Sequence, residues 1–201
     1  MKVLIIYCHP SRKSYTYEIL EQLKLSLERN ELEYEVSDLY EMGFESDMNE
    51  KEYEREGFGK TELPIRQDVY AEHQKIHKAD CLIFVYPVWW SDCPAKLKGW
   101  FDRVYAAGYA YDCSKEKEIE QMKNIKYGLV ICTAGYSNTY LDKIGLAESM
   151  RKVMIDDRLG ERFQKKDMVL LGGTLDKSKV RPIHSKIIKS IGETIKKYTL
   201  N

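Results

Sequence analysis

The sequence has little of what marks exported, membrane-spanning or nucleic-acid-binding chains. No run approaches the about 18 consecutive apolar residues that a transmembrane helix needs. The apolar run in the amino-terminal stretch MKVLIIYCHP is too short for the apolar region of a signal peptide, and no small-residue cleavage site follows it. Lys and Arg together number 32, as do Asp and Glu, so the basic excess that favours nucleic acid or an anionic membrane is missing. We therefore expect a cytoplasmic protein that binds no nucleic acid and inserts into no membrane.

Disulfide frameworks, metal-ligand spacings and nucleotide fingerprints are missing as well. The five cysteines are an odd number, are scattered singly and form no C-x-x-C motif (Cys8, Cys81, Cys93, Cys113 and Cys132). We expect reduced thiols and no structural metal. The sequence contains no G-x-G-x-x-G and no Walker sequence, which disfavours a dinucleotide on a Rossmann-type loop and an NTPase.

Short apolar runs that alternate with helical patterns dominate what is present. Runs typical of strands lie at residues 2–8, 34–39, 81–86, 127–132 and 168–171. Helical patterns lie at 14–28, at 68–78, from Pro94 onward, along a face of Leu146, Met150 and Val153, and from Pro182, with Ile187, Ile188, Ile191 and Ile195 on the buried side. This alternation predicts one α/β domain over residues 1–201, a doubly wound sheet of five parallel strands in the order 2-1-3-4-5 with helices on both faces.

Residues 44–66 combine dense mixed charge with several glycines and a proline, and show no stable period. One interpretation is a solvated excursion from the sheet. The other is a segment that folds over a ligand or a partner subunit, because structureless loops longer than about 12–15 residues are uncommon. Asp68, just beyond, is expected to cap the helix that follows.

Ligands of such sheets bind at the carboxyl ends of the strands, where the strand order reverses. This rule brings together the loops 9–16, 87–93 and 133–140. The first loop offers hydroxyls, two basic side chains and a helix amino terminus, a set that suits a phosphate (Ser11, Arg12, Lys13, Ser14 and Thr16). Alternatively, Ser14 merely caps the helix and His9 is an ordinary loop histidine.

The second and third loops suit a flat ring. Trp89 and Trp90 follow a strand, where neither the core of the strand nor that of the next helix can accommodate both. The third loop, Thr133-Ala134-Gly135-Tyr136, supplies a glycine for close backbone approach, a hydroxyl and another aromatic ring. A phosphate cradle and an aromatic bed at one point of the sheet together favour a flavin mononucleotide moiety.

The run YPVWWSDCPAKLKGWFDRVYAAGYAY, with the opening KVLIIYCHPSRKSYT and the TAGY loop, resembles the flavodoxin-fold NAD(P)H:quinone oxidoreductase family. This family includes the mammalian DT-diaphorases and their shorter bacterial and archaeal relatives. The resemblance implies a flavodoxin-like fold, non-covalent FMN or FAD, and a homodimer. It also implies that NAD(P)H passes hydride through the flavin to a quinone or similar small acceptor by a ping-pong route.

The resemblance also implies roles for individual residues. Contacts on the phosphate side of the flavin would come from His9, Ser14, Tyr15 and Thr16, in addition to the contact from Ser11 that the first loop itself predicts. The ring would lie between two sets of residues, namely Pro87, Val88, Trp89 and Trp90 on one side and Thr133, Ala134, Gly135 and Tyr136 on the other. Tyr140 would lie at the O2 edge of the flavin as a catalytic residue. Tyr111 would reach across a dimer interface and form, with Trp89 and Trp90, an apolar slot for NAD(P)H and acceptor in turn. Two departures are that residues 141–145 contain no histidine and that position 73 is His where Gln is common.

Two other functions fit a flavin-binding chain, namely a one-electron carrier of the flavodoxin type and a flavoprotein that regulates a transporter. Such carriers usually present a strongly acidic docking face, which a net charge of zero disfavours. A homodimer is also expected because Trp100 and Phe101 give more aromatic surface than one helix face usually buries. The alternative is that both are core residues.

Overall fold

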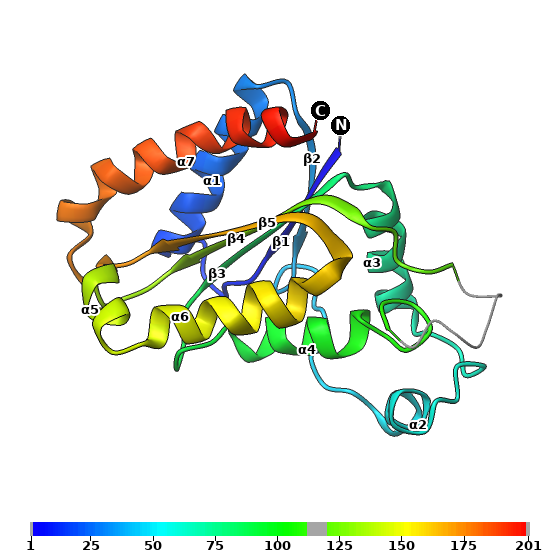
Figure 1. The fold of residues 1–201 in the computed structure, drawn as a ribbon. Helices are drawn as coiled ribbons and strands as arrows, with labels where there is room; N and C mark the ends of the chain where they lie inside the picture. The colour runs from blue at the N-terminus through cyan, green and yellow to red at the C-terminus, as the bar shows by residue number, and fades with distance from the viewer. Residues whose placement is uncertain (1, 112–119, 200–201) are drawn as a thin grey trace.

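The computed structural model describes residues 2–111 and 120–199. Its centre is a sheet of five parallel strands in the order β2-β1-β3-β4-β5 (Figure 1). The strands are β1 (Lys2–Tyr7), β2 (Glu33–Asp38), β3 (Cys81–Pro87), β4 (Ile125–Thr133) and β5 (Phe163–Leu171). The predicted fold class and strand order are therefore confirmed. β5 begins earlier than the apolar run predicts, because polar residues fill its first half, as suits a strand at the edge of the sheet.

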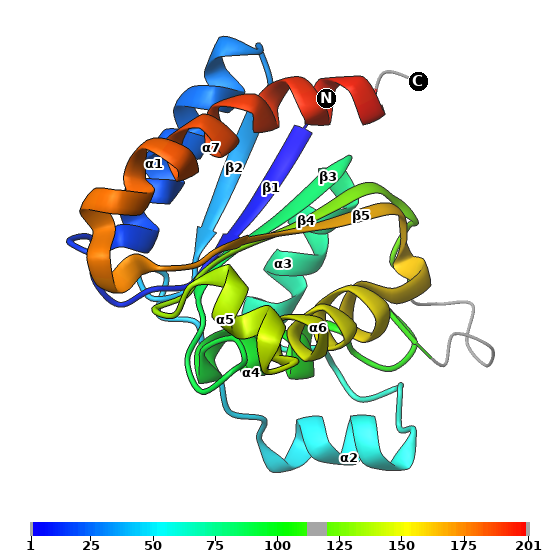
Figure 2. The same cartoon turned by 60° about the vertical axis from the view of Figure 1, so that its left-hand side comes forward.

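Helices cover both faces of the sheet (Figures 1 and 2). One face carries α1 (Tyr15–Arg29) and α7 (Lys177–Thr199); the other carries α3 (Gln67–Lys78), α4 (Ala95–Val104) and α6 (Leu146–Arg151). A π-helical segment, η1 (Lys152–Leu159), continues α6, and the short α5 (Asn138–Lys143) follows β4. The described residues also form two 3-10 turns, η2 (Gly160–Arg162) and η3 (Thr174–Asp176).

The alternation of side chains along the central strands produces one core on each face. Val3 and Ile5 pack towards α1 and α7, whereas Leu4 and Ile6 pack towards α3 and α4. All seven residues of β3 are buried. Burial on both faces explains why these strands are unbroken apolar runs in the sequence.

Residues 44–66 are not structureless, because they contain the helix α2 (Glu50–Phe58). Asn49 and Glu52 form a reciprocal capping box at its start, and Gly59 ends it in the left-handed conformation. The helix lies beyond α4, away from the sheet (Figure 2). The buried Arg103 of α4 holds this segment, because its guanidinium binds the Glu45 carbonyl at 2.6 Å and the Glu52 carboxylate at 2.7 Å.

Four expectations about helices are wrong. Arg66 rather than Asp68 occupies the N-cap position of α3, and Asp68 instead pairs with Arg103. α7 begins at Lys177, so Pro182 lies inside the helix rather than at its start, and Ile187 is 37% exposed. Val153 is 40% exposed, and Met154 takes its place in the core because the π-helical turns of η1 change which residues face the sheet.

Trp100 and Phe101 are both buried within their own chain, in an aromatic cluster with Phe84. Their interpretation as core residues is confirmed, so they lend no support to a dimer. Four cysteines are free and buried, namely Cys8, Cys81, Cys93 and Cys132, whereas Cys113 lies outside the described residues.

Candidate functional site

The loops that follow β1, β3 and β4 lie together at the carboxyl ends of these strands. The Val88 N–H donates to the Thr133 carbonyl at 2.8 Å, and the hydroxyls of Thr16 and Thr133 lie 2.8 Å apart. The rings of His9 and Trp89 meet edge to face, with their centroids 5.9 Å apart. These contacts link all three predicted loops at the point where the order of the strands reverses.

The tryptophan pair lies on a tight turn with a strained backbone. The N–H of Trp89 donates to the Asp92 carbonyl at 2.9 Å, and the N–H of Asp92 donates to the Trp89 carbonyl at 3.2 Å. The two central residues, Trp90 and Ser91, have φ angles of +48° and +64°. Such two-residue turns usually contain Asn and Gly, because left-handed backbone costs other residues about 1–2 kcal/mol each. The Trp90 side chain is fully exposed and Trp89 is 42% exposed, so packing within the chain does not explain this strain.

Asp92 joins this turn to the rest of the site. Its carboxylate accepts from the Cys93 N–H at 2.7 Å and from both terminal nitrogens of Arg158, at 2.7 and 2.8 Å. Burial raises the pKa of Asp92, but the hydrogen bonds from Arg158 and Cys93 outweigh it and hold this pKa below its usual value. Burial raises the pKa of the Cys93 thiol to about 12, so this thiol stays protonated near neutral pH.

The first loop is a helix start with amide donors. The Ser14 hydroxyl accepts from the Tyr17 N–H at 3.0 Å, so the capping role of Ser14 is real. The first N–H groups of a helix have no partner within it, so those of Tyr15 and Thr16 point towards the loop and favour an anion there. The side chains of Tyr15 and Thr16 are buried, and the Tyr15 hydroxyl lies 3.0 Å from His184 Nδ1.

His9 and Ser11 stabilise the path of this loop. His9 Nδ1 accepts from the Ser11 N–H at 3.0 Å, and the Ser11 hydroxyl accepts from the Lys13 N–H at 3.2 Å. Burial lowers the pKa of His9, so its imidazole is neutral near pH 7. Arg12 is engaged by Glu41 at 2.5 Å. The amides at the start of α1 therefore remain as donors for a phosphate, beside the exposed side chain of Lys13.

The second and third loops border an apolar hollow of about 440 Å³. Its lining residues come from both loops, α5, α6 and η3 (Val88, Trp90, Ser91, Ala134, Gly135, Tyr136, Leu141, Leu146, Met150 and Leu175). The ring of Tyr136 lies beside that of Tyr140, with the centroids 4.9 Å apart, although Tyr140 is not itself one of the lining residues. Sequence reasoning missed Ser91, Leu141, Leu146, Met150 and Leu175 as lining residues. The spacing of Leu146 and Met150 places them on one face of a predicted helix, whereas no pattern in the sequence singles out Leu175.

These features fit a flavin. The volume falls within the range of about 300–1,000 Å³ for small-molecule sites, whose linings are mostly apolar with few polar groups. Trp90 adds a flat, fully exposed surface beside the hollow, and the start of α1 adds amide donors suited to a phosphate. A ring between the second and third loops with its phosphate at the first loop satisfies both halves of the site.

Tyr111 does not join this site within its own chain. It follows the carboxyl end of α4, whereas Trp89 and Trp90 precede the amino end of the same ten-residue helix. The helix alone spans about 15 Å. The Tyr111 hydroxyl donates to Glu56 at 2.8 Å, and Tyr111 lines a separate hollow of about 370 Å³ near Phe101 and Tyr105.

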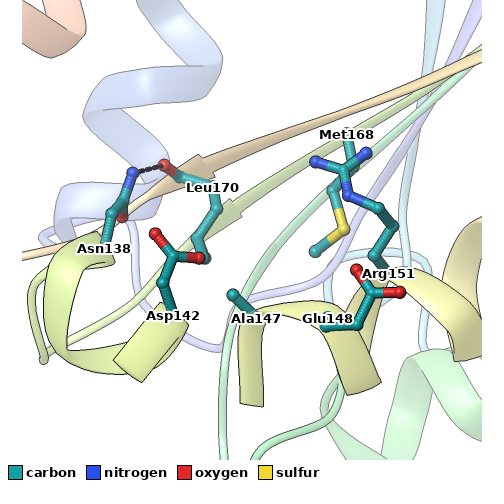
Figure 3. A pocket seen from close by; sticks show the side chains of 7 residues that line it. All are labelled: Asn138, Asp142, Ala147, Glu148, Arg151, Met168 and Leu170. Carbon is teal, nitrogen blue, oxygen red and sulfur yellow. Dashed lines mark hydrogen bonds between the residues drawn. The ribbon is translucent and has the colours of Figure 1, made fainter. Parts of the chain in front are cut away.

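A third hollow has a volume of about 310 Å³ (Figure 3). The residues of α6 that line it are Ala147, Glu148 and Arg151, whereas Leu146 and Met150 line the apolar one. Its lining is mostly polar and comes from α5, α6 and β5 (Asn138, Asp142, Ala147, Glu148, Arg151, Met168 and Leu170). Asn138 joins two of these elements, because its amide donates to the Leu170 carbonyl and its oxygen accepts from the Gly172 N–H, each at 2.9 Å. A Cβ atom at Gly172 would lie 2.2 Å from this oxygen, so only glycine fits there. No pattern in the sequence predicts this hollow.

Two negative findings hold for residues 2–111 and 120–199. No group of three or more His, Cys, Asp or Glu side chains there could hold a metal ion. None of the helices in these ranges is long and apolar enough to cross a membrane.

Comparison with known proteins agrees with this geometry. The family model described as "Flavodoxin-like fold" matches residues 1–159. The solved NAD(P)H:quinone oxidoreductase from Methanothermobacter marburgensis is 43% identical, with a TM-score of 0.89 over 98% of this chain and 97% of that one. NAD(P)H dehydrogenase [quinone] 1 of Cavia porcellus is 33% identical over 69% of this chain, which spans only 55% of that relative.

A third protein shares the fold alone. An FMN-dependent NADH-azoreductase from Bacillus anthracis, solved in complex with FMN, is 20% identical with a TM-score of 0.71 over 97% of this chain and 99% of that one. The family match covers most of the chain, and the archaeal relative matches it over nearly its full length. The chain belongs to the flavodoxin-like-fold family of NAD(P)H:quinone oxidoreductases.

Proposed function

We propose that this chain is a flavin-dependent oxidoreductase that transfers hydride from NAD(P)H to a quinone or a similar small acceptor. The observation that carries the proposal is the exposed tryptophan pair on a strained turn beside an apolar hollow, at the reversal point of the sheet. A backbone held in unfavourable conformations at a ligand site is typical of functional turns.

The cofactor in this proposal is non-covalent FMN or FAD. The start of α1, with His9, Ser11 and Ser14, would hold the phosphate, and residues 87–90 and 133–136 would hold the ring. A bound flavin would supply the capacity to accept hydride from one substrate and give it to the next. The FMN complex of the azoreductase supports this choice of cofactor class only through its shared fold.

The side chains of the site would act mainly by positioning. Trp89 and Trp90 present apolar surface that excludes water and orients a flat substrate over the ring. Tyr140 is 45% exposed and lies beside Tyr136, so its hydroxyl can donate a hydrogen bond to the flavin edge. His9, being neutral, adds no charge beside the phosphate.

A homodimer is part of the proposal because Tyr111 lies beyond the carboxyl end of α4, too far from the tryptophan turn to serve the site of its own chain. Tyr111 is 45% exposed, so a second copy of the chain could receive it. Its hydroxyl is held by Glu56, which also accepts from the Ala107 N–H at 2.6 Å. The segment 44–66 therefore positions Tyr111, which agrees with the interpretation that this segment serves a partner subunit.

The proposed function can be tested in two steps. The colour and mass of the cofactor released from purified protein identify the flavin. Anaerobic titration with NADH and with NADPH then separates an enzyme from a carrier, because rapid two-electron bleaching is expected only of the enzyme. A chain that binds no flavin, or whose flavin neither nucleotide reduces, would contradict the proposal.

Paired variants locate the site. Trp90→Ala is expected to weaken flavin retention or lower turnover, whereas Tyr70→Ala, another exposed aromatic residue on the distant helix α3, is the control. Equal behaviour of both variants would remove the turn from the site.

A further inference from the structure

The turn that carries Trp90 needs an anchor outside itself. Its two central residues lie in left-handed backbone, and two hydrogen bonds between Trp89 and Asp92 close it. Neither central residue is a glycine, so the turn is not held by its own conformational preference. Some other contact must select this conformation if Trp90 is to remain in one place.

Arg158 makes that contact. Its two terminal nitrogens bind the two oxygens of Asp92 at 2.7 and 2.8 Å, a bidentate geometry that restricts both partners. Asp92 itself is one of the two residues that close the turn, and its carboxylate also accepts from the Cys93 N–H. One guanidinium therefore restrains both the turn and the chain that leaves it.

Arg158 is itself fixed by packing. Its side chain is 8% exposed, and its guanidinium lies over the Phe101 ring with 5.3 Å between the guanidinium carbon and the ring centroid. One of the two nitrogens that bind Asp92, Nη1, also lies 3.3 Å from Cys93 Sγ and 3.1 Å from Met154 Sδ. Few other rotamers are open to a side chain enclosed in this way.

The helical segment that presents Arg158 is unusual. Arg158 belongs to η1, whose π-helical turns place Met154 and Arg158 on the buried side and Val153 on the outside. π-helical turns are rare and occur frequently at functional sites. The preceding helix, α6, supplies Leu146 and Met150 to the wall of the apolar hollow. The continuous helical element of α6 and η1 thus forms a wall of the hollow and anchors the Trp89–Asp92 turn.

We infer that Arg158 is a positioning residue that acts through Asp92 to fix the Trp89–Asp92 turn against the flavin ring and the substrates. This inference rests on the proposed function and deepens it. Arg158 is buried and does not line the apolar hollow, so it would act on the site through its contact with Asp92. Lys could keep the charge but not the bidentate fork.

The test uses the variants Arg158→Lys and Asp92→Asn in the full chain. Each is expected to raise the Kd for the flavin about tenfold and to lower kcat/KM by about 10- to 100-fold, because small displacements of a positioning group are costly. The double variant should lose little more than either single one, because both changes remove the same contact. Additive losses would mean that the two residues act separately and would overturn the inference.

A control separates positioning from general stability. Ile188→Ala removes a fully buried side chain of α7 on the opposite face of the sheet, far from the turn in the fold. It should lower the unfolding midpoint as much as the test variants or more, while the Kd for the flavin stays within about twofold. If Ile188→Ala raises the Kd as much as Arg158→Lys does, the effect of Arg158 is one of stability and the inference fails.

Hydrogen exchange without added flavin tests the anchor independently of the chemistry. The amides of Trp89 and Asp92 should exchange faster in Arg158→Lys and Asp92→Asn than in the wild type, while amides of β3 stay protected. Unchanged exchange overturns the inference. A wild-type chain that binds no flavin overturns the proposed function and the positioning role together. If the wild type binds flavin and the variants keep its Kd, kcat/KM and exchange rates, only the positioning role is overturned.

Discussion

At the scale of one residue, Trp90 predicts opposite effects of a substitution on the stability of the chain and on the proposed flavin site. Its positive φ angle is costly for any residue with a Cβ atom, and its side chain makes up none of the core. Trp90→Gly should therefore leave the free energy of unfolding unchanged or raise it by up to about 1 kcal/mol, while flavin retention or turnover falls. Urea unfolding and flavin titration measure the two effects.

Two further variants serve as comparisons. Ser91→Gly should change stability in the same direction, because Ser91 has a similar φ angle. Trp90→Ala removes the ring but keeps a Cβ atom and its strain, so it should not stabilise. A marked loss of stability in Trp90→Gly would show that the indole packs on the chain after all.

His73 predicts a pH dependence of folding. Burial lowers its pKa to about 4, its ring stacks on Tyr109 with centroids 3.5 Å apart, and its Nε2 lies 2.8 Å from the Val104 carbonyl oxygen. Between about pH 6.5 and 4 the unfolded chain therefore binds a proton at this residue that the folded chain does not. Stability falls as the pH drops through this window, by about 3 kcal/mol at most.

The variant His73→Gln isolates this contribution. Gln can still hydrogen-bond to the Val104 carbonyl but does not titrate, so its free energy of unfolding should fall less steeply between pH 6.5 and 4. His9 and His184, whose pKa values burial also lowers, remain in both proteins and cancel in the difference. Parallel stability curves for the two proteins across this window would contradict the assignment.

At the scale of elements, the attachment of the segment 44–66 depends on one glycine of α4. A Cβ atom at Gly99 would lie 2.1 Å from the Ser46 carbonyl oxygen, a distance that the backbone cannot tolerate. Gly99→Ala should therefore destabilise the protein by more than about 1 kcal/mol, although Ala is normally the better helix residue by that amount. Limited proteolysis should also cut faster within residues 44–66.

Gly57→Ala, within α2, is the matched control. There a Cβ atom would meet only the Tyr53 ring at 3.1 Å, and this ring can move. The variant should be neutral or stabilising. If both variants behave alike, contact with Ser46 does not decide the effect at Gly99.

Elements with unbroken apolar runs could be predicted from the sequence, and elements held by polar contacts could not. The five strands and their order follow from apolar runs and the rules for parallel sheets. α2 escapes such reasoning because its sequence, EKEYEREGF, has hardly any apolar face and is held by a capping box and by Arg103. The exposed Val153 escapes it because π-helical turns leave no mark in apolar spacing.

The candidate site divides in the same way. Trp89 and Trp90 stand out because two large aromatics in a loop have no ordinary place in a core. Arg158 does not, because it lies 66 residues from Asp92 and its role depends on the turns of η1. Leu175 borders the hollow only because the chain after β5 returns to the third loop, where the Thr174 N–H donates to the Ala134 carbonyl at 3.0 Å.

At the scale of the whole molecule, the distance between Tyr111 and the tryptophan turn is the reason why the proposed site would need two chains. These features lie beyond opposite ends of α4. In a dimer with two-fold symmetry, each site would take its turn from one protomer and its Tyr111 from the other. Light scattering of the purified protein should therefore give the mass of two chains.

Mixing two defective variants tests whether the Tyr111 of each site comes from the same protomer as the tryptophan turn or from its partner. Trp89→Ala/Trp90→Ala and Tyr111→Ala should each be weakly active alone. After subunit exchange of equal amounts, half of the dimers would be mixed. Each mixed dimer would contain one intact site and one site with both defects. About a quarter of all sites would then be intact, so about a quarter of the wild-type activity should return. If Tyr111 served its own protomer, every site in the mixed dimer would keep one defect and activity would not recover. Recovery therefore requires that the tyrosine cross between subunits, and its absence, with exchange verified by mass, would contradict the shared site.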